Sequence, residues 1–594
     1  LEDKEFKLLS WGLVDAGFDE EEFLELLDEI AEQVEDDRTA EEIRQSLLDK
    51  ALITKVKYST KHLWRTRMAE TVRLLFRLRQ LFPKHRDQQK WRSAPTLVSD
   101  YRFVAKKRRF PKRDVPAKKF IEEALENKSQ EFKAPLEALT RTEGEPLMLA
   151  SFQVRSTERI LRSIGSSEPT ATLVSAGTGS GKTKAVYLPA LAHLASISDP
   201  DSWTKMLALY PRTELIKDQL RALLLELRLL KKYSGKSLSV GVWYGDTPYN
   251  TVEDGLPKSW KKERGRRVCP FLKCLSCESN LYLSNDGGLE CSSNSCSDVI
   301  KKDELILTRK QMQDTEPDVL LTSVETLNRR ISDDWSKHVF GVGPKVKHPP
   351  RVLLLDEVHV YSGIPGAQVT HLLRRWRHAV GSPVHTVGLS ATITDGDVFF
   401  SQLASVHQND VTVVEPKHDE YLNEGKEYLI ALRGNPASAT SLMSTTIQAI
   451  MLLRRSLDLL SSKISKGAYG SKLFAFTDNL DITNRFVHFL RNAEGQTDNG
   501  KIDPNKTEGS LANLRHSALP DRQSRIDDGQ DWEKIKKDLK VLEKAVYSND
   551  AQTTSSNVEI SDDSSDILTK HLLKLSELEE QFKTLTNNFE EINF

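Results

Sequence analysis

A glycine-rich segment between two apolar stretches contains the residue types that bind phosphate. The sequence TLVSAGTGSGKTKAVYLPALAHL, at residues 172–194, predicts a strand, a tight turn and a helix. Glycines let the backbone curl so that several N–H groups face one anion at the positive end of that helix. We expect Lys182 to reach the β- and γ-phosphates of ATP and the Thr183 hydroxyl to ligate Mg²⁺. The residues expected to enclose the phosphates are Ala176, Gly177, Thr178, Gly179, Ser180, Gly181, Lys182 and Thr183.

A second apolar run ends in two carboxylates. Residues 351–359 read RVLLLDEVH, and a buried strand here would bring both acidic groups to the carboxyl edge of a parallel sheet, beside the phosphate-binding turn. We expect Asp356 to hold Mg²⁺ through water. We expect Glu357 to polarise the attacking water, because phosphoryl transfer to water needs a base-like group. His359 is the expected link between this site and movement on nucleic acid.

Three shorter motifs match elements that couple ATP hydrolysis to nucleic-acid binding. YPRTEL at residues 210–215 and TSVE at residues 322–325 both follow apolar runs, where backbone amides and hydroxyls can contact phosphates without reading sequence. Gln153, upstream of the phosphate loop, is expected to read the adenine ring. The expected nucleic-acid contacts are Pro211, Arg212, Thr213, Thr322 and Ser323. The expected coupling residues, in the sequence GLSAT, are Ser390, Ala391 and Thr392.

All five cysteines of the chain lie between residues 269 and 296, in the spacing C-x4-C-x2-C-x13-C-x4-C. Clustering of this kind indicates a metal site rather than a set of disulfides. Two cysteine knuckles around a short hairpin predict a structural zinc ribbon, in which thiolates stabilise a core too small to fold otherwise. An iron–sulfur cluster and a site without metal are the alternatives. The favoured ligands are Cys274, Cys277, Cys291 and Cys296, with Cys269 in reserve.

Composition describes a globular chain with an uneven charge distribution. Hydrophobic residues make up 38% and charged residues 29% of 594 residues, so several packed domains are expected. No stretch approaches the roughly 18 apolar residues of a membrane span, and we expect a cytoplasmic protein with no membrane partner. The net charge is −1, but residues 102–119 are strongly basic. That stretch is expected to be either a nucleic-acid contact or a linker bound to acidic neighbours.

Two longer segments give the motifs a family context. Residues 356–375 read DEVHVYSGIPGAQVTHLLRR, and residues 240–248 read VGVWYGDTP. Together with the phosphate loop and SAT, they resemble DEAD/DEAH-type superfamily 2 DNA helicases of the Lhr and MrfA (YprA) kind, over roughly residues 149–490. The resemblance implies two RecA-like domains, ATP·Mg²⁺ hydrolysis and 3′-to-5′ movement on single-stranded DNA. The flanking segments resemble the large helicases of bacterial anti-phage or DNA-modification islands such as Druantia, DISARM and the Dpd cluster, which implies partner subunits of a defence complex.

Alternation of short apolar runs with helical stretches from residue 149 predicts an α/β fold with a RecA-like parallel sheet, a helical N-terminal domain and an inserted zinc ribbon. The expected divisions are a helical domain at 1–95, a basic arm and helix at 96–148, a first RecA-like ATPase domain at 149–410 with the ribbon at about 262–300, the start of a second RecA-like domain at 411–495, and a polar, helical segment at 496–594.

The second RecA-like domain is expected to be incomplete. SKLFAFTDN at residues 471–479 resembles motif IV, but no motif V or arginine-bearing motif VI follows. We interpret this as a chain that continues naturally beyond Phe594; residues joined across gaps, or a degenerate motor, are the alternatives. The favoured function is an ATP-dependent DNA helicase or translocase. An RNA-directed motor and an ATP-binding scaffold that does not unwind are the competing interpretations.

Overall fold

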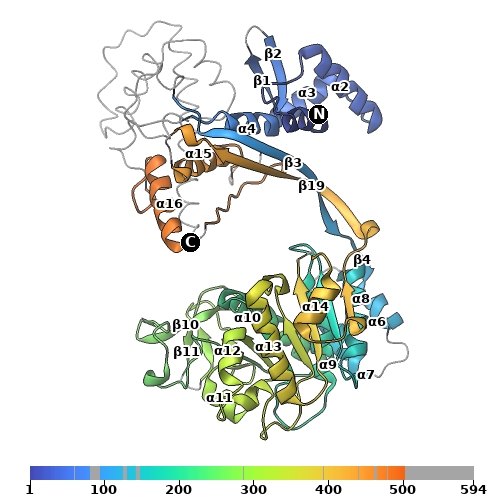
Figure 1. Cartoon of the computed structure of the whole chain (residues 1–594), viewed down its shortest axis with the longest axis vertical. Coiled ribbons are helices and arrows are strands. Elements are labelled where there is room, and N and C mark those ends of the chain that lie inside the picture. Colours follow the sequence, from blue (N-terminus) through green and yellow to red (C-terminus); the bar gives the residue numbers. More distant parts are fainter. Residues whose placement is uncertain are drawn as a thin grey trace. The chain divides into compact units, whose positions relative to one another are not determined.

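The computed structural model divides the chain into two compact units (Figure 1). Unit 1 comprises Leu1–Arg108 and the residues from Gly425 onward, and unit 2 comprises Arg109–Glu424. Most of the polar, helical segment expected at 496–594, from residue 502 onward, lies outside the described residues. The structure describes residues 1–501 except 59–60, 80–93, 125–129, 142–146, 285–286, 392, 439–440, 460–463 and 478.

Unit 2 is built on an eight-stranded sheet in the order β14-β8-β15-β7-β16-β17-β6-β18, and every pair of neighbours is parallel. The predicted α/β class with a RecA-like parallel sheet is confirmed. Its strands are β6 (Ala171–Ser175), β7 (Met206–Tyr210), β8 (Val240–Trp243), β14 (Leu305–Ile306), β15 (Val319–Ser323), β16 (Val352–Leu355), β17 (His385–Ser390) and β18 (Val411–Val414).

Helices cover both faces of this sheet, which is why its strands are apolar throughout. Along β7, Met206, Ala208 and Tyr210 pack into one buried cluster, whereas Leu207 and Leu209 pack into another. The first cluster contains residues from α7 (Gln130–Leu139), α8 (Ser151–Ser163), α9 (Lys182–Ser196) and α10 (Thr213–Ser234). The second contains residues from α11 (Arg309–Asp314), α12 (Val324–Arg330), α13 (Gly363–Val380) and α14 (Gly396–Ala404).

A smaller antiparallel sheet in the order β13-β12-β11-β10-β9 is inserted between β8 and β14. It corresponds to the predicted ribbon and packs through Phe271 and Leu272 into the same buried cluster as α10. In Figure 1, β10 and β11 lie on the side of unit 2 away from α6 (Ala117–Ala124). The five strands are β9 (Lys262–Glu263), β10 (Arg266–Lys273), β11 (Asn280–Leu283), β12 (Leu289–Cys291) and β13 (Val299–Ile300).

Unit 1 differs from the expectation of an all-helical N-terminal domain. Residues 53–58 and 61–66 form the two antiparallel strands of a hairpin, in which Ile53 pairs with Thr66. Trp64 of this hairpin stacks on Phe23 of α2 with ring centroids 5.1 Å apart, so the hairpin completes a core that the helices alone do not close. The elements are α1 (Glu2–Ser10), α2 (Glu20–Gln33), α3 (Ala40–Asp49), β1 (Ile53–Tyr58), β2 (Lys61–Thr66), α4 (Arg67–Phe76), α15 (Leu442–Arg455) and α16 (Leu480–Ala493).

The expected basic arm and the expected start of a second RecA-like domain also take other forms. The arm contains β3 (Val98–Pro111), which pairs with β19 (Tyr421–Gly434), and β4 (Arg113–Pro116), which pairs with β5 (Met148–Ala150). β18 belongs to the first sheet although it follows residue 410. The described residues 471–477 form no strand. No helix in the described part of the chain is long and apolar enough to cross a membrane.

Candidate nucleotide and metal sites

The carboxyl ends of three adjacent strands bring the predicted catalytic motifs together. β17 lies between β16 and β6, with Leu355 paired to Gly388 and Ser390 paired to Ser175. Because all three strands are parallel, the phosphate loop after β6, the acidic pair after β16 and the SAT segment after β17 leave the sheet at one edge. Crevices at this edge are where open α/β sheets bind nucleotides.

The phosphate loop has the backbone that its glycines predict. Gly179 and Gly181 have φ values of +75° and +87°, in the left-handed region that glycine adopts without strain. A side chain at Gly177 or Gly179 would meet no atom within 4 Å, so this side of the loop is open. Ser180 is buried and its hydroxyl has no partner within the described residues. An open loop at the N-terminus of the 15-residue helix α9 fits a bound phosphate.

Lys182 connects the phosphate loop to the SAT segment. Its Nζ donates to the Ser390 carbonyl oxygen at 2.9 Å, and the Ala176 N–H donates to the same oxygen at 3.2 Å. Burial lowers the pKa of Lys182, and the nearby charges of Glu357 and Asp356 oppose that shift. The ammonium group therefore lies in the field of both carboxylates.

The acidic pair is half enclosed by the fold. Asp356 is 7% exposed, and burial, followed by the charge of Glu357, raises its pKa to about 6. Its Oδ1 accepts a hydrogen bond from the Glu357 N–H at 2.9 Å. Glu357 itself has a left-handed backbone, with φ of +47°, a strained conformation of the kind found at functional sites.

His359 lies where a coupling residue is expected. Its Nδ1 is 3.3 Å from the Oε2 of Glu357 and 3.3 Å from the Oγ of Ser390. One imidazole thus contacts both the acidic motif and the SAT segment, while its side chain stays partly exposed. Ala391 follows β17 and is half-buried, and Thr392 lies outside the described residues.

Gln153 is close to the phosphate loop, but its contacts are with backbone. Its Nε2 donates to the Gly181 carbonyl oxygen at 2.9 Å, and its Oε1 accepts from the Ala150 N–H at 2.8 Å. The side chain is 4% exposed. The structure therefore shows Gln153 fixing the start of α9, a role that the sequence pattern did not predict.

The predicted nucleic-acid residues lie at the same sheet edge, after β7 and β15, which are the next two strands beyond β16. Arg212 and Thr213 follow β7 and are exposed, and Pro211 beside them is half-buried. Thr322 differs from the prediction: it is fully buried and its hydroxyl donates to the Trp243 carbonyl oxygen at 2.7 Å. That hydroxyl links β15 to β8 and is not accessible to a ligand. Ser323 is half-buried and caps α12, accepting from the Thr326 N–H.

Four of the five cysteines converge. The Sγ atoms of Cys274, Cys277, Cys291 and Cys296 all lie within 4.8 Å of one another. The Cys274–Cys296 and Cys277–Cys291 sulfur pairs are 3.7 and 3.4 Å apart. A tetrahedral ion with Zn–S bonds of about 2.3 Å needs sulfurs about 3.8 Å apart, so the four thiols fit Zn²⁺.

Cys269 lies apart from this group. It is 3% exposed in the core below the ribbon, where burial raises its pKa to about 12, and its sulfur is not among the four that converge. Two arginines of α10 fasten the ribbon to the sheet: Arg221 donates to the Cys274 carbonyl oxygen, and Arg228 pairs with Asp298 at 2.8 Å.

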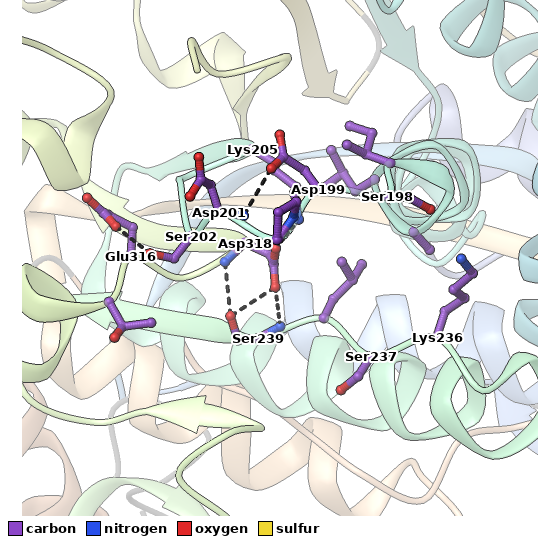
Figure 2. A pocket seen from close by; sticks show the side chains of 16 residues that line it. Ser198, Asp199, Asp201, Ser202, Lys205, Lys236, Ser237, Ser239, Glu316 and Asp318 are labelled. Carbon is purple, nitrogen blue, oxygen red and sulfur yellow. Dashed lines mark hydrogen bonds and ion pairs between the residues drawn. The ribbon is translucent and has the colours of Figure 1, made fainter. Parts of the chain in front are cut away.

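A cavity of about 350 Å³ lies at the opposite edge of the large sheet, where β7, β8 and β15 begin (Figure 2). No residue of the predicted sites lines it. Figure 2 shows that its polar side chains bind one another: Lys205 pairs with Asp318, which also accepts from Ser239, and Ser202 donates to Glu316. The nucleotide chemistry is therefore not located in this cavity.

The loop, the acidic pair and the parallel sheet define a P-loop ATPase of the RecA-like class. Residues 151–258 match the DEAD/DEAH box helicase family. Druantia protein DruE from Escherichia coli (strain UMEA 4076-1) is 24% identical over 286 residues. The match covers 39% of this chain and 16% of that relative, so the chain spans about a sixth of the relative's length.

Two solved helicase structures also align with the chain. The DUF1998 helicase MrfA bound to DNA and AMPPNP is 15% identical, covers 62% of this chain and 39% of MrfA, and gives a TM-score of 0.35. The DEAD-box helicase Mss116 bound to ssRNA and UDP-BeF is 16% identical, covers 52% of this chain and 46% of Mss116, and gives a TM-score of 0.32. The match of residues 151–258 to the DEAD/DEAH box helicase family confirms the resemblance in the motifs.

Proposed function

We propose that this protein hydrolyses ATP to drive movement along single-stranded DNA. One observation carries the proposal: the ATP-site motifs after β6, β16 and β17 share a sheet edge with the exposed loop after β7, and β7 pairs directly with β16. The acidic pair after β16 is therefore one strand away from Arg212 and Thr213. Movement of a motor requires this kind of short connection between its two sites.

The residues of the site fit ATP and Mg²⁺. Lys182 would hold the β- and γ-phosphates against the N-terminus of α9, and the amides of residues 177–182 would donate to them. The open loop, the Thr183 hydroxyl and the buried Asp356 carboxylate suit a hard cation, which prefers oxygen ligands. Bound Mg²⁺ would neutralise charge on the phosphates. Glu357 would accept a proton from the attacking water. His359, which contacts both Glu357 and Ser390, would couple the protonation of Glu357 to the SAT segment.

DNA is the proposed substrate because the segments at residues 240–248 and 356–375 resemble DNA helicases of the Lhr and MrfA kind. The similarity to a Druantia protein supports a role in anti-phage defence, with other subunits of a defence complex as partners. We also propose that the protein acts in the cytoplasm. The zinc ribbon would be a structural part of the ATPase unit, because its four thiols have the spacing of a closed Cys₄ site.

ATP turnover by the full-length protein, with and without nucleic acid, tests this function. Single-stranded DNA should stimulate turnover, and Glu357→Gln should lower it about 10²–10⁴-fold while ATP still binds. Glu168→Gln removes the same charge from an exposed loop before β6 and should match the wild type. Stronger stimulation by RNA would favour an RNA-directed motor. ATP binding without turnover on any nucleic acid would favour a scaffold and overturn the proposal.

A further inference from the structure

A short basic hairpin opens the inserted ribbon. Lys262 and Glu263 of β9 pair with Arg267 and Arg266 of β10, leaving a two-residue turn of Arg264 and Gly265. These turn residues have φ values of +49° and +80°, as in a type I′ turn, whose twist matches that of the two strands. The hairpin is therefore a defined structure with an arginine at its tip.

The hairpin and the residues before it carry an excess of positive charge. Within residues 258–267, six side chains are basic and Glu263 alone is acidic. Lys262 and Arg267 pair with Glu253, and Arg266 pairs with Glu290. The other three cations are exposed and have no ion-pair partner among the described residues: Lys258, Lys261 and Arg264.

The hairpin is anchored to the loop that follows β8. Trp260 is fully buried, and its Nε1 donates to the Asp246 carbonyl oxygen at 2.9 Å. The Arg267 guanidinium donates to the Trp260 carbonyl oxygen at 2.7 Å. Phe271 of β10 packs edge-on against Trp260 and against Tyr244, with centroids 5.8 and 5.9 Å away. These contacts fix the base of the hairpin at the carboxyl end of β8.

This position lies at the edge of the sheet that carries the exposed loop after β7. β15 separates β8 from β7, with Thr322 paired to Trp243 and Ser323 paired to Tyr210. At about 4.8 Å per strand, the ends of β8 and β7 are roughly 10 Å apart. One DNA strand, which carries a charge about every 3.4 Å of duplex axis, can therefore contact both positions.

We propose that the β9–β10 hairpin binds the phosphate backbone of DNA through Lys258, Lys261 and Arg264, next to the strand held at Arg212. The proposal rests on the proposed function, and it adds a contact from the inserted ribbon to the ATPase sheet. Binding at these residues would be independent of sequence, because cations on a phosphate backbone read no bases. Each cation that meets a phosphate releases a condensed counterion, so the contact can be counted from the salt dependence of binding.

The test compares DNA binding by the wild-type chain with that by a triple variant, Lys258→Ala, Lys261→Ala and Arg264→Asn. Asparagine is used at position 264 because Asn-Gly suits a type I′ turn. For single-stranded DNA, the slope of log K against log salt should become shallower by about 2, at roughly 0.7 per phosphate contact. Between 50 and 200 mM salt, the variant should therefore lose about 20-fold less affinity than the wild type. Melting temperature and zinc content establish that the variant is folded.

A matched control removes three exposed lysines, Lys236, Lys301 and Lys302, from the segments that precede β8 and β14 at the opposite sheet edge. The control should keep the wild-type slope. A hairpin variant with the wild-type slope, or a control that shifts as much, would overturn the hairpin contact while leaving the motor function intact. A wild-type chain that binds no DNA would overturn both proposals.

Discussion

Exchange of Gln153 for glutamate changes one contact of the phosphate loop with almost no change in shape. Glutamate can still accept from the Ala150 N–H, but its second oxygen faces the Gly181 carbonyl, to which the amide now donates at 2.9 Å. The Gly181 carbonyl keeps its bond from the Ala185 N–H, but the buried glutamate oxygen that faces it has no donor, which costs about 1–3 kcal/mol. Because Gly181 begins α9 at the phosphate site, we expect ATP to bind about 5- to 150-fold more weakly.

Equilibrium titration with a fluorescent ATP analogue measures this effect. Gln402→Glu is the matched control, because Gln402 is exposed on α14, which packs on the other face of the sheet from α8. Gln153→Ala removes both hydrogen bonds without adding charge, and it should weaken binding less than Gln153→Glu. Binding by Gln153→Glu within twofold of the wild type would refute the role assigned to this side chain.

Three further predictions concern the buried carboxylate, the cysteines and the loop glycine. The pKa of Asp356 is about 6 instead of 3.8, so its charged form destabilises the fold above pH 6, by roughly 2–3 kcal/mol. Without Mg²⁺, Asp356→Asn should therefore raise the melting temperature at pH 8. This gain should decrease below pH 6 and vanish by pH 4. An equal gain in melting temperature at pH 8 and at pH 4 would contradict the prediction. Cys269→Ala should retain one zinc ion per chain by elemental analysis, whereas Cys291→Ala should lose it. Gly181→Ala should abolish ATP binding in the same titration, because φ is +87° and the new methyl would lie 2.7 Å from Gln153 Nε2.

The sequence predicted the parts of the site that are local in the chain. The phosphate loop, RVLLLDEVH and GLSAT each join a buried strand to a polar turn within a few residues. Their apolar runs identify strands, and parallel packing then requires the turns to meet at one edge. The four-cysteine group could be predicted from the cysteine spacing, because only short segments of chain separate the ligands.

Contacts between distant or polar segments could not be predicted in this way. The sequence of β3 indicated a basic arm because it shows no apolar alternation. In the structure most of its side chains are exposed, and its partner strand β19 lies about 300 residues away in the chain. The bond from Gln153 to Gly181 joins two helices whose sequences do not reveal it. The burial of Thr322 was also missed, because the motif identifies the loop but not which hydroxyl the neighbouring strand already holds.

The central claim is that Lys182 and the Asp356–Glu357 pair act on one nucleotide at one sheet edge. A crystal structure of the Glu357→Gln variant with ATP and Mn²⁺ tests it most directly, because Mn²⁺ gives an anomalous signal in place of Mg²⁺. One manganese peak is expected between Thr183 and Asp356, with the γ-phosphate in contact with Lys182. A nucleotide bound elsewhere, or a manganese peak remote from Asp356, would contradict it.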